Sequence, residues 1–258
     1  GHACPVYYTL LSLFGFDVSL QDLKSLRVLG SKTPGHPEYR VTDGIEVTTG
    51  PLGQGVANAV GMALAQSIMA ERFNSVGFSI INNYTYCLAG DGCLMEGIAQ
   101  EACSLAGTLN LNRLILLYDS NDVSMDGSLN VSNRENVAKK FKAMGWNVIK
   151  CNSGNSFRDC SKAIAKAKKM EGPTIIIFKT TIGIGTDKEG TSAIHGVALS
   201  EEELKVFNKK LGVFENFFVP NDVRDWCMAS SRRGKLNHEK WNQDLAVYAT
   251  SNPELYRQ

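Results

Sequence analysis

The stretch Leu114-Ile-Leu-Leu-Tyr118-Asp-Ser-Asn-Asp122 joins a continuous apolar run directly to a run of polar residues. A short, uninterrupted apolar run is typical of a strand that is buried on both faces of a parallel sheet. In such sheets, ligands bind just beyond the carboxyl ends of the strands, which is where the polar run begins. The stretch therefore predicts both a buried parallel strand and a ligand-binding edge.

Similar apolar runs alternate with helical patterns on both sides of this stretch. Further strands are predicted over residues 84–88, 146–150 and 174–178, and helices over residues 54–72, 96–107, 137–144 and 157–170. Strands that alternate with helices predict an α/β fold, a doubly wound parallel sheet sandwiched between helices. Near the start, two helices are expected over residues 3–14 and 19–26, and Ser19 and Asp22 have the spacing of a capping box.

Composition excludes several classes of protein. The 258 residues include 27 Lys and Arg and 26 Asp and Glu, a formal net charge of +1. Binding to nucleic acid or to an anionic membrane is not expected, because it requires a basic excess. No apolar run approaches the roughly 20 residues of a membrane span. The 7 cysteines form no CxxC pair, so we interpret them as reduced, mostly buried side chains of a cytoplasmic protein, although the chain begins at Gly1 and not at Met.

Two more predicted strands end in small and polar residues. Gly90-Asp91-Gly92 follows the first strand, and Thr180-Thr-Ile-Gly-Ile-Gly185 follows the last. Asp91 and Asn121 are separated by about one βαβ unit, roughly 30 residues, so their side chains are expected to lie next to each other. A carboxylate and an amide oxygen suit Mg²⁺ or Ca²⁺, with phosphate oxygens and water as further ligands. We therefore predict a divalent metal site that anchors a diphosphate, which the backbone at the two glycines can approach closely.

A glycine-rich turn and three histidines complete the candidate residues. Gly50-Pro-Leu-Gly-Gln-Gly55 leads into a predicted helix but matches neither a Walker loop nor the dinucleotide-binding glycine pattern. Its backbone N–H groups can still face an anion or a ring. His2, His36 and His195 lie in loop-like, glycine-bearing segments, where histidine can move protons or donate to hydroxyls and phosphates.

Taken in order, these motifs closely resemble the transketolase family. They are Gly1-His2, Ser31-Lys-Thr-Pro-Gly-His-Pro-Glu-Tyr39, Glu46-Val-Thr-Thr-Gly-Pro-Leu-Gly-Gln-Gly55, Gly90-Asp-Gly-Cys-Leu-Met-Glu-Gly97, Tyr118-Asp-Ser-Asn-Asp-Val-Ser-Met-Asp-Gly127 and Thr180–Gly185. The resemblance implies the thiamine diphosphate-binding fold and the family's N-terminal, diphosphate-binding domain. That domain is expected over residues 1–219, without its beginning. Residues 220–258 are expected to be a charged linker or extension toward a pyrimidine-binding domain that this chain lacks.

The resemblance also implies the cofactor and its ligands. Thiamine diphosphate is expected with Mg²⁺ or Ca²⁺, bound by the side chains of Asp91 and Asn121 and the carbonyl of Val123. Gly92 would contact the diphosphate through its backbone. The remaining cofactor contacts implied are the turn Gly50, Pro51 and Leu52 and the side chain of Ile182.

The same resemblance implies catalytic roles for four residues. His2 and His195 match histidines near the diphosphate and the reaction centre, and His36 matches one that contacts hydroxyls of the substrate. Glu96, together with Glu101, matches acidic residues that couple the two sites of a homodimer at the subunit interface. This sequence departs from the family at Ser192-Ala-Ile-His195-Gly-Val-Ala-Leu199, where family members often have proline before the last leucine, so the local loop is expected to shift.

The activity implied is the transfer of a two-carbon ketol group from a ketose phosphate to an aldose phosphate, as in the pentose phosphate pathway. The segment alone is expected to be inactive, because the family's pyrimidine-binding domain supplies the activating glutamate. Dihydroxyacetone synthase shares this domain and is an alternative, and so is a non-catalytic transketolase-like subunit. A deoxyxylulose-phosphate synthase is less favoured by Thr33-Pro-Gly-His-Pro-Glu38, and a NAD-dependent dehydrogenase lacks support because its glycine pattern is missing.

Overall fold

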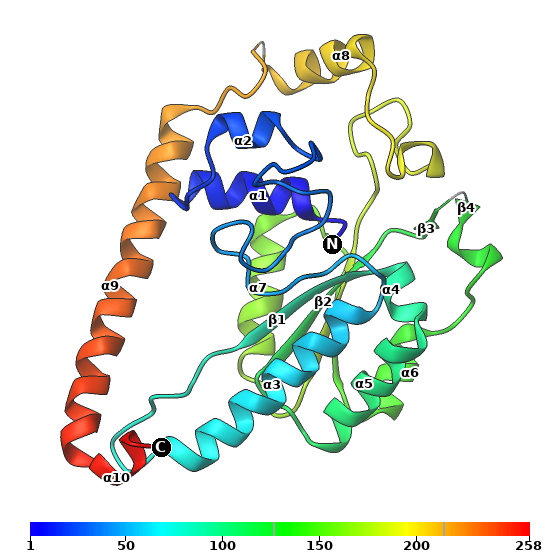
Figure 1. Ribbon diagram of the computed structural model, residues 1–258. Helices are drawn as coiled ribbons and strands as arrows, with labels where there is room; N and C mark the ends of the chain where they lie inside the picture. The colour runs from blue at the N-terminus through cyan, green and yellow to red at the C-terminus, as the bar shows by residue number, and fades with distance from the viewer. Residues whose placement is uncertain (126, 214) are drawn as a thin grey trace. The chain divides into compact units, whose positions relative to one another are not determined.

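The computed structural model describes residues 1–125, 127–213 and 215–258. The chain divides into two compact units, one formed by Gly1–Pro51, Ala65–Asn82 and Phe217–Gln258, the other by Leu52–Leu64 and Asn83–Asn216. Helix α3 (Gln54–Phe73) contributes its first part to the second unit and its last part to the first (Figure 1).

A parallel sheet forms the centre of the second unit. Its described strands lie in the order β1 (Thr85–Gly90), β2 (Leu114–Ser120), β6 (Thr174–Lys179) and β5 (Asn147–Cys151). Each neighbouring pair is parallel. The four apolar runs of the sequence are these four strands, so the prediction of a parallel sheet is confirmed.

Helices cover both faces of this sheet (Figure 1). On one face, α5 (Gly97–Thr108), α6 (Val137–Ala143) and the first part of α3 pack against Leu114 and Leu116. On the other face, α7 (Phe157–Ala167) packs against Ile115 and Ile176. Successive residues of β2 thus point to opposite layers, as strand geometry requires. The doubly wound α/β architecture predicted from the sequence is confirmed.

Short elements follow the carboxyl ends of the strands. They are α4 (Asp91–Met95), β3 (Val123–Ser124), β4 (Gly127–Ser128), η1 (Leu129–Val131), η2 (Ser192–Ile194) and α8 (Glu201–Leu211). The segment Gly90-Asp91-Gly92, expected to follow the first strand, leads directly into a helix: Asp91 begins α4 and Gly90 is its N-cap residue. A carboxylate in the first turn of a helix interacts favourably with the unpaired N–H groups there.

The first unit contains α1 (Cys4–Leu13) and α2 (Leu20–Lys24), and the predicted capping box of Ser19 and Asp22 is present. The irregular segment over residues 30–52 is fixed by buried hydroxyl groups. The Tyr8 hydroxyl donates to the Pro34 carbonyl at 2.9 Å, Thr33 Oγ1 donates to the Asp22 carbonyl at 2.6 Å, and Thr42 Oγ1 donates to the Lys32 carbonyl at 2.5 Å. These bonds give a long loop a defined shape.

The end of the chain, predicted to be a charged linker or extension, is helical. Residues Asn221–Ser251 form α9, a helix of 31 residues, and Pro253–Tyr256 form α10. Few apolar residues hold α9, which is why its sequence pattern is weak. Trp241 Nε1 donates to the Ile80 carbonyl at 2.9 Å, and the Tyr248 hydroxyl donates to the Phe73 carbonyl at 2.6 Å. Its role as an extension of the domain over residues 1–219 stays a prediction.

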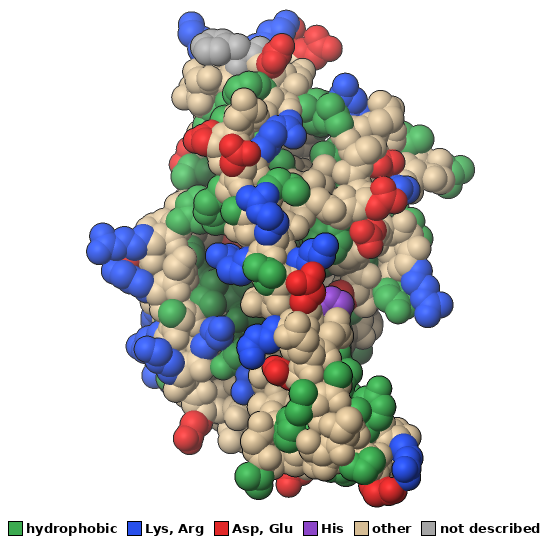
Figure 2. Space-filling view, turned by 90° about the vertical axis from the view of Figure 1, so that its left-hand side faces the viewer, with side chains coloured by type: hydrophobic (Ala, Val, Ile, Leu, Met, Phe, Trp, Pro, Cys, Tyr) green, Lys and Arg blue, Asp and Glu red, His purple; other side chains and the backbone are tan. Residues whose placement is uncertain are grey.

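The surface carries charges of both signs. Figure 2 shows Lys and Arg side chains together with Asp and Glu side chains on one face, in keeping with the balanced composition. The basic run Arg232–Lys235 is exposed to solvent. None of the helices in the described ranges is long and apolar enough to cross a membrane.

Candidate active site

The ends of β1, β2 and β6 meet at one edge of the sheet. The pairing register places Gly90 beside Asp119 and Ser120 beside Lys179. The three predicted polar segments therefore start from adjacent strands, as the sequence analysis expected. Further interactions join the end of β6 to the end of β2: Thr180 Oγ1 donates to Asp119, the backbone N–H of Thr180 donates to the Ser120 carbonyl at 3.2 Å, and Lys179 forms an ion pair with Asp122.

Asp91 is the buried carboxylate of this edge, with 5% of its surface exposed. The Tyr118 hydroxyl donates to Asp91 Oδ1, and the backbone N–H of Asn121 approaches Asp91 Oδ2 at 3.4 Å. Asp91 and Asn121 are thus brought together as predicted.

Burial raises the pKa of the Asp91 carboxyl, and the negative charges of Asp122 and Asp119 raise it further, although the bonds from Tyr118 and Asn121 oppose this. A buried carboxylate among other acids is poorly compensated unless a cation is nearby. The electrostatics of this edge of the sheet therefore fit a positively charged ligand.

The side chain of Asn121 is oriented by two hydrogen bonds. Its Oδ1 accepts the backbone N–H of Val123 at 3.1 Å, and its Nδ2 donates to Asp119 Oδ2 at 3.4 Å. An amide oxygen has a second lone pair, so Oδ1 can also bind a metal. A carboxylate, an amide oxygen and a backbone carbonyl are hard donors of the kind that Mg²⁺ and Ca²⁺ prefer. The residues present therefore fit a divalent ion.

Small residues leave room next to this group. A Cβ atom added to Gly90 would meet no heavy atom within 4 Å, whereas one added to Gly92 would lie 3.0 Å from Leu52 Cδ1. Gly92 and Leu52, both predicted to contact the cofactor, thus lie close together. The next residue, Gly53, packs so tightly on α4 that a Cβ there would lie 2.6 Å from Glu96 Cβ.

Ile182 and His195 lie on one loop after β6. The Ile182 carbonyl accepts the N–H of Gly190 at 2.8 Å. Gly183 is so close to Ile194, the neighbour of His195, that an added Cβ would lie 2.8 Å from Ile194 Cγ2. Both residues are half-buried. These contacts within the loop therefore fix the positions of Ile182 and His195 relative to each other.

A second group of predicted residues lies in the first unit. The rings of His2 and His36 have centroids 5.7 Å apart. A Cβ on Gly1 would lie 2.9 Å from the Cα of Gly50, and a Cβ on Gly50 would lie 3.2 Å from the His36 ring. His36 thus lies next to both the ring of His2 and Gly50, and Pro51 is the last residue of that segment.

The two glutamates assigned to subunit coupling are exposed. Glu96 links α4 to α5, and Glu101 lies on α5. Their predicted role is untested by this arrangement.

Four further members of the site were not predicted from the sequence: Tyr118, Asp119, Lys179 and Thr180. In the sequence, Tyr118 is the last residue of an apolar run, which predicts a buried strand residue. Its role in the site is evident only from the hydrogen bond that its hydroxyl donates to Asp91. The signal that could have found Thr180 and Lys179 is their place directly after a buried strand, the criterion that selected Asp91 and Asn121.

Comparison with known proteins places this arrangement in a family. A family model described as "Transketolase, thiamine diphosphate binding domain" matches residues 1–258. Transketolase of Geobacillus stearothermophilus is 50% identical over 263 residues, which cover 100% of this chain and 39% of the relative. Transketolase of Bacillus subtilis is 47% identical with the same coverage.

Solved structures agree with the sequence relatives. Transketolase from Leishmania mexicana superposes with a TM-score of 0.97 at 44% identity, covering 100% of this chain and 39% of that one. Transketolase from Pichia stipitis, in a complex with sedoheptulose-7-phosphate, gives 0.97 at 42% identity and the same coverage. The chain thus spans about 39% of the length of these relatives. Because the family model and the relatives match it from end to end, the chain belongs to the transketolase family and forms a thiamine diphosphate-binding domain of that family.

Proposed function

We propose that this chain is part of a transketolase, which transfers a two-carbon ketol group from a ketose phosphate to an aldose phosphate. The observation that carries the proposal is the buried carboxylate of Asp91 beside Asn121, at the edge where three strands end. Family membership and the complex of a relative with a sugar phosphate support it. A cytoplasmic homodimer with active sites at the subunit interface is the assembly that the resemblance favours.

Asp91, Asn121 and the carbonyl of Val123 would hold Mg²⁺ or Ca²⁺, and the ion would bind the diphosphate. When bound, thiamine diphosphate supplies a carbon nucleophile and an electron sink for breaking a carbon–carbon bond. Tyr118 orients Asp91 through its hydroxyl. The backbone at Gly90, where an added Cβ would meet no heavy atom within 4 Å, leaves space for phosphate oxygens, and Gly92 would contact them through its backbone. Anchoring of the charged end keeps the reacting end of the cofactor in a fixed place.

The remaining site residues act near the reacting atoms. Leu52 and Ile182 supply apolar surface that excludes water. His195 can donate to or accept protons from an oxygen of the substrate, and His2 and His36 can bind hydroxyl or phosphate oxygens. Glu96 would connect the site to a second subunit.

Calorimetry on the complete gene product tests the cofactor assignment. We expect binding of thiamine diphosphate that requires Mg²⁺ or Ca²⁺, and no binding of NAD. Metal-independent binding would contradict the assignment of Asp91 and Asn121. Failure to bind thiamine diphosphate under any condition would contradict the whole proposal.

The choice of acceptor separates a transketolase from its alternatives. With a ketose phosphate donor, we expect faster transfer to ribose 5-phosphate than to formaldehyde. Preference for formaldehyde would indicate a dihydroxyacetone synthase. Cofactor binding without transfer to either acceptor would indicate a non-catalytic subunit. The segment 1–258 alone, assayed in parallel, is expected to be inactive.

A further inference from the structure

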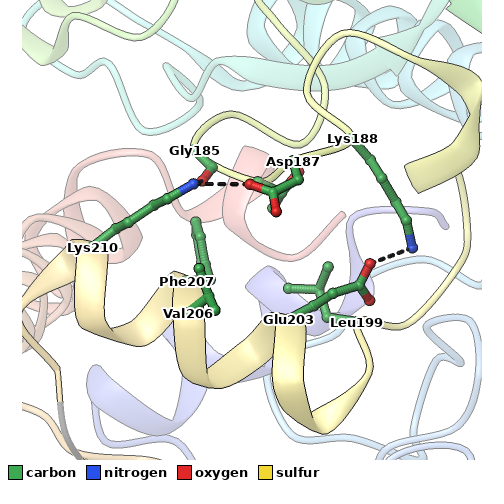
Figure 3. A pocket seen from close by; sticks show the side chains of 9 residues that line it. Gly185, Asp187, Lys188, Leu199, Glu203, Val206, Phe207 and Lys210 are labelled. Atoms are coloured by element: carbon green, nitrogen blue, oxygen red, sulfur yellow. Dashed lines mark hydrogen bonds and ion pairs between the residues drawn. The ribbon is translucent and has the colours of Figure 1, made fainter.

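Helix α8 contacts residues 185–188, which belong to the loop that carries Ile182 and His195. Figure 3 shows this junction, where Asp187 and Lys188 on the loop face Lys210 and Glu203 on α8. The space between them holds only about 10 Å³, roughly one water molecule. The junction is therefore a packed contact between two segments and not a ligand pocket.

The first connection is the ion pair between Lys188 Nζ and Glu203 Oε1, at 2.7 Å. Both side chains are only about one-third exposed, at 34% and 31%. The other oxygen, Glu203 Oε2, accepts the backbone N–H of Ser200 at 2.8 Å, and Ser200 Oγ accepts the N–H of Glu203 at 3.3 Å. Glu203 therefore both caps the helix and binds the loop.

The second connection lies two turns further along α8. Lys210 Nζ is 3.1 Å from Asp187 Oδ1 and 3.2 Å from the carbonyl oxygen of Gly185, to which it donates. Phe207 packs between the two connections, so close that a Cβ on Gly185 would lie 3.0 Å from its Cε2 atom. The φ of Gly185 is +85°, which also favours glycine. The loop thus contacts α8 through ionic, polar and apolar groups.

Further hydrogen bonds lead from this junction to the predicted site residues. The N–H of Gly185 donates to Glu189 Oε2 at 2.8 Å, and Thr186 Oγ1 donates to the Gly183 carbonyl at 2.7 Å. Gly183 in turn packs against Ile194, the residue before His195. The shape of the loop at Ile182 and His195 therefore depends on the turn that α8 holds.

We propose that α8 is a clamp that fixes the loop of residues 180–199, and that Lys188, Glu203 and Lys210 are positioning residues for cofactor binding. The clamp acts through Ile182 and His195 and does not touch the reacting atoms. This inference rests on the proposed function, since the cofactor role of these two residues is part of it. Without the clamp, the loop adopts more conformations, and a smaller fraction of the molecules has the conformation that binds the cofactor. The apparent affinity for the cofactor decreases in proportion to that fraction.

Glu203→Gln isolates the ion pair, because glutamine at this position can still complete the capping box. Glu201→Gln is the matched control: it makes the same charge change in the same helical turn, and Glu201 forms no ion pair in the described part of the chain. A partly exposed ion pair changes an equilibrium by up to about fivefold. We expect Glu203→Gln, in the complete gene product, to raise the dissociation constant of thiamine diphosphate with Mg²⁺ about threefold, and Glu201→Gln to leave it unchanged.

Hydrogen exchange of the cofactor-free protein gives a readout independent of activity. The hydrogen-bonded amides of Gly185, Thr186 and Gly190 are expected to exchange several-fold faster in Glu203→Gln than in Glu201→Gln, while amides of the central strands do not change. Lys188→Met is expected to have the same effect, and the double variant no larger one, because both remove a single interaction. Lys188→Arg is expected to retain slow exchange.

Kinetics distinguish positioning from general destabilisation. With saturating cofactor, kcat of Glu203→Gln is expected to stay within about twofold of wild type, because bound cofactor restores the loop. Equal exchange rates in the two glutamine variants, or equal cofactor affinities, would overturn the clamp. Lys210→Met provides a second test if Glu203→Gln folds poorly. Absence of cofactor binding by the wild type would instead count against the proposed function, while hydrogen exchange would still decide whether α8 fixes the loop.

Discussion

Tyr118, on β2, donates a hydrogen bond from its hydroxyl to the buried carboxylate of Asp91, the residue that follows the neighbouring strand β1. This bond fixes one oxygen of the residue on which the proposed metal site depends. It also explains why the last buried residue of β2 is a tyrosine, whose hydroxyl can donate a hydrogen bond, and not an aliphatic residue.

Replacement of Tyr118 by phenylalanine should weaken metal binding without unfolding the protein. Loss of a residue that orients a metal ligand typically lowers metal affinity by roughly 10–100-fold. Titration of Mg²⁺ in the presence of thiamine diphosphate measures this effect. Tyr86→Phe, which removes the hydroxyl of a half-exposed tyrosine on β1, is the control. Equal Mg²⁺ affinity in the two variants would argue against an orienting role.

Asp91→Asn should abolish metal-dependent cofactor binding. The free energy of unfolding of the cofactor-free variant should equal or exceed that of the cofactor-free wild type. The pKa of Asp91 is raised in the folded protein, so the folded state binds the proton of this carboxyl more tightly than the unfolded state does. The stability that results is present at low pH and is lost as the pH rises through the pKa of Asp91 in the folded state. At pH 7, a neutral amide therefore removes an unfavourable buried charge.

Thermal unfolding with and without Mg²⁺ and thiamine diphosphate measures both effects of Asp91→Asn. Ligand at 100 times its dissociation constant should stabilise the wild type by about 2.7 kcal/mol and the variant not at all. Asp225→Asn, at an exposed carboxylate of α9, should behave as wild type. A ligand-induced shift in Asp91→Asn would remove this residue from the metal site.

The contribution of Glu203 to stability should depend on pH only in acid. Its ion pair with Lys188 and its bonds to Ser200 lower the pKa from 4.5 to about 2. An acid with a lowered pKa stabilises the fold above its ordinary pKa, and this stability is lost as the pH falls toward the folded-state value. Urea unfolding should therefore show a constant difference between wild type and Glu203→Gln above about pH 5.5, because the carboxyl is then ionised in both states. The difference should decrease below pH 4.5, and a decrease between pH 7 and 6 would contradict this assignment.

Gly107→Ala should destabilise the second unit strongly. A Cβ at this position would lie 1.7 Å from the carbonyl oxygen of Met144, and a backbone atom cannot move aside easily. Overpacking typically lowers the free energy of unfolding by about 1–3 kcal/mol, and the contact with a backbone atom places this variant near the upper value. Gly97→Ala in the same helix meets no atom within 4 Å and should change stability by no more than about 1 kcal/mol. Similar unfolding midpoints for the two variants would show that α5 and α6 can separate.

The fold and the main pair of the site could be predicted from the sequence because both depend on local patterns. Apolar runs marked the four strands, and parallel order then brought the ends that carry Asp91 and Asn121 together. The contacts of Tyr118 with Asp91 and of Thr180 with Asp119 were not predicted, since they depend on the exact register between strands far apart in the chain.

Helix α9 shows a different limit of sequence analysis. It is largely exposed, and only Cys227 and Tyr248 of its described residues are buried, so its apolar periodicity is weak. The bonds of Trp241 and Tyr248 to distant carbonyl groups secure it, and single residues of this kind leave no periodic signal.

The strand order also has a consequence for biosynthesis. In the described sheet, β6 lies between β2 and β5, although it is the last of the four to be made. A nascent chain can pair β1 with β2 early, but β5 must wait for β6, and the Thr180–Asp119 bond spans 61 residues. Such distant parallel pairing is slow to form. The edge of the sheet at which Asp119 accepts the Thr180 hydroxyl is therefore expected to be complete only after β6 has been synthesised.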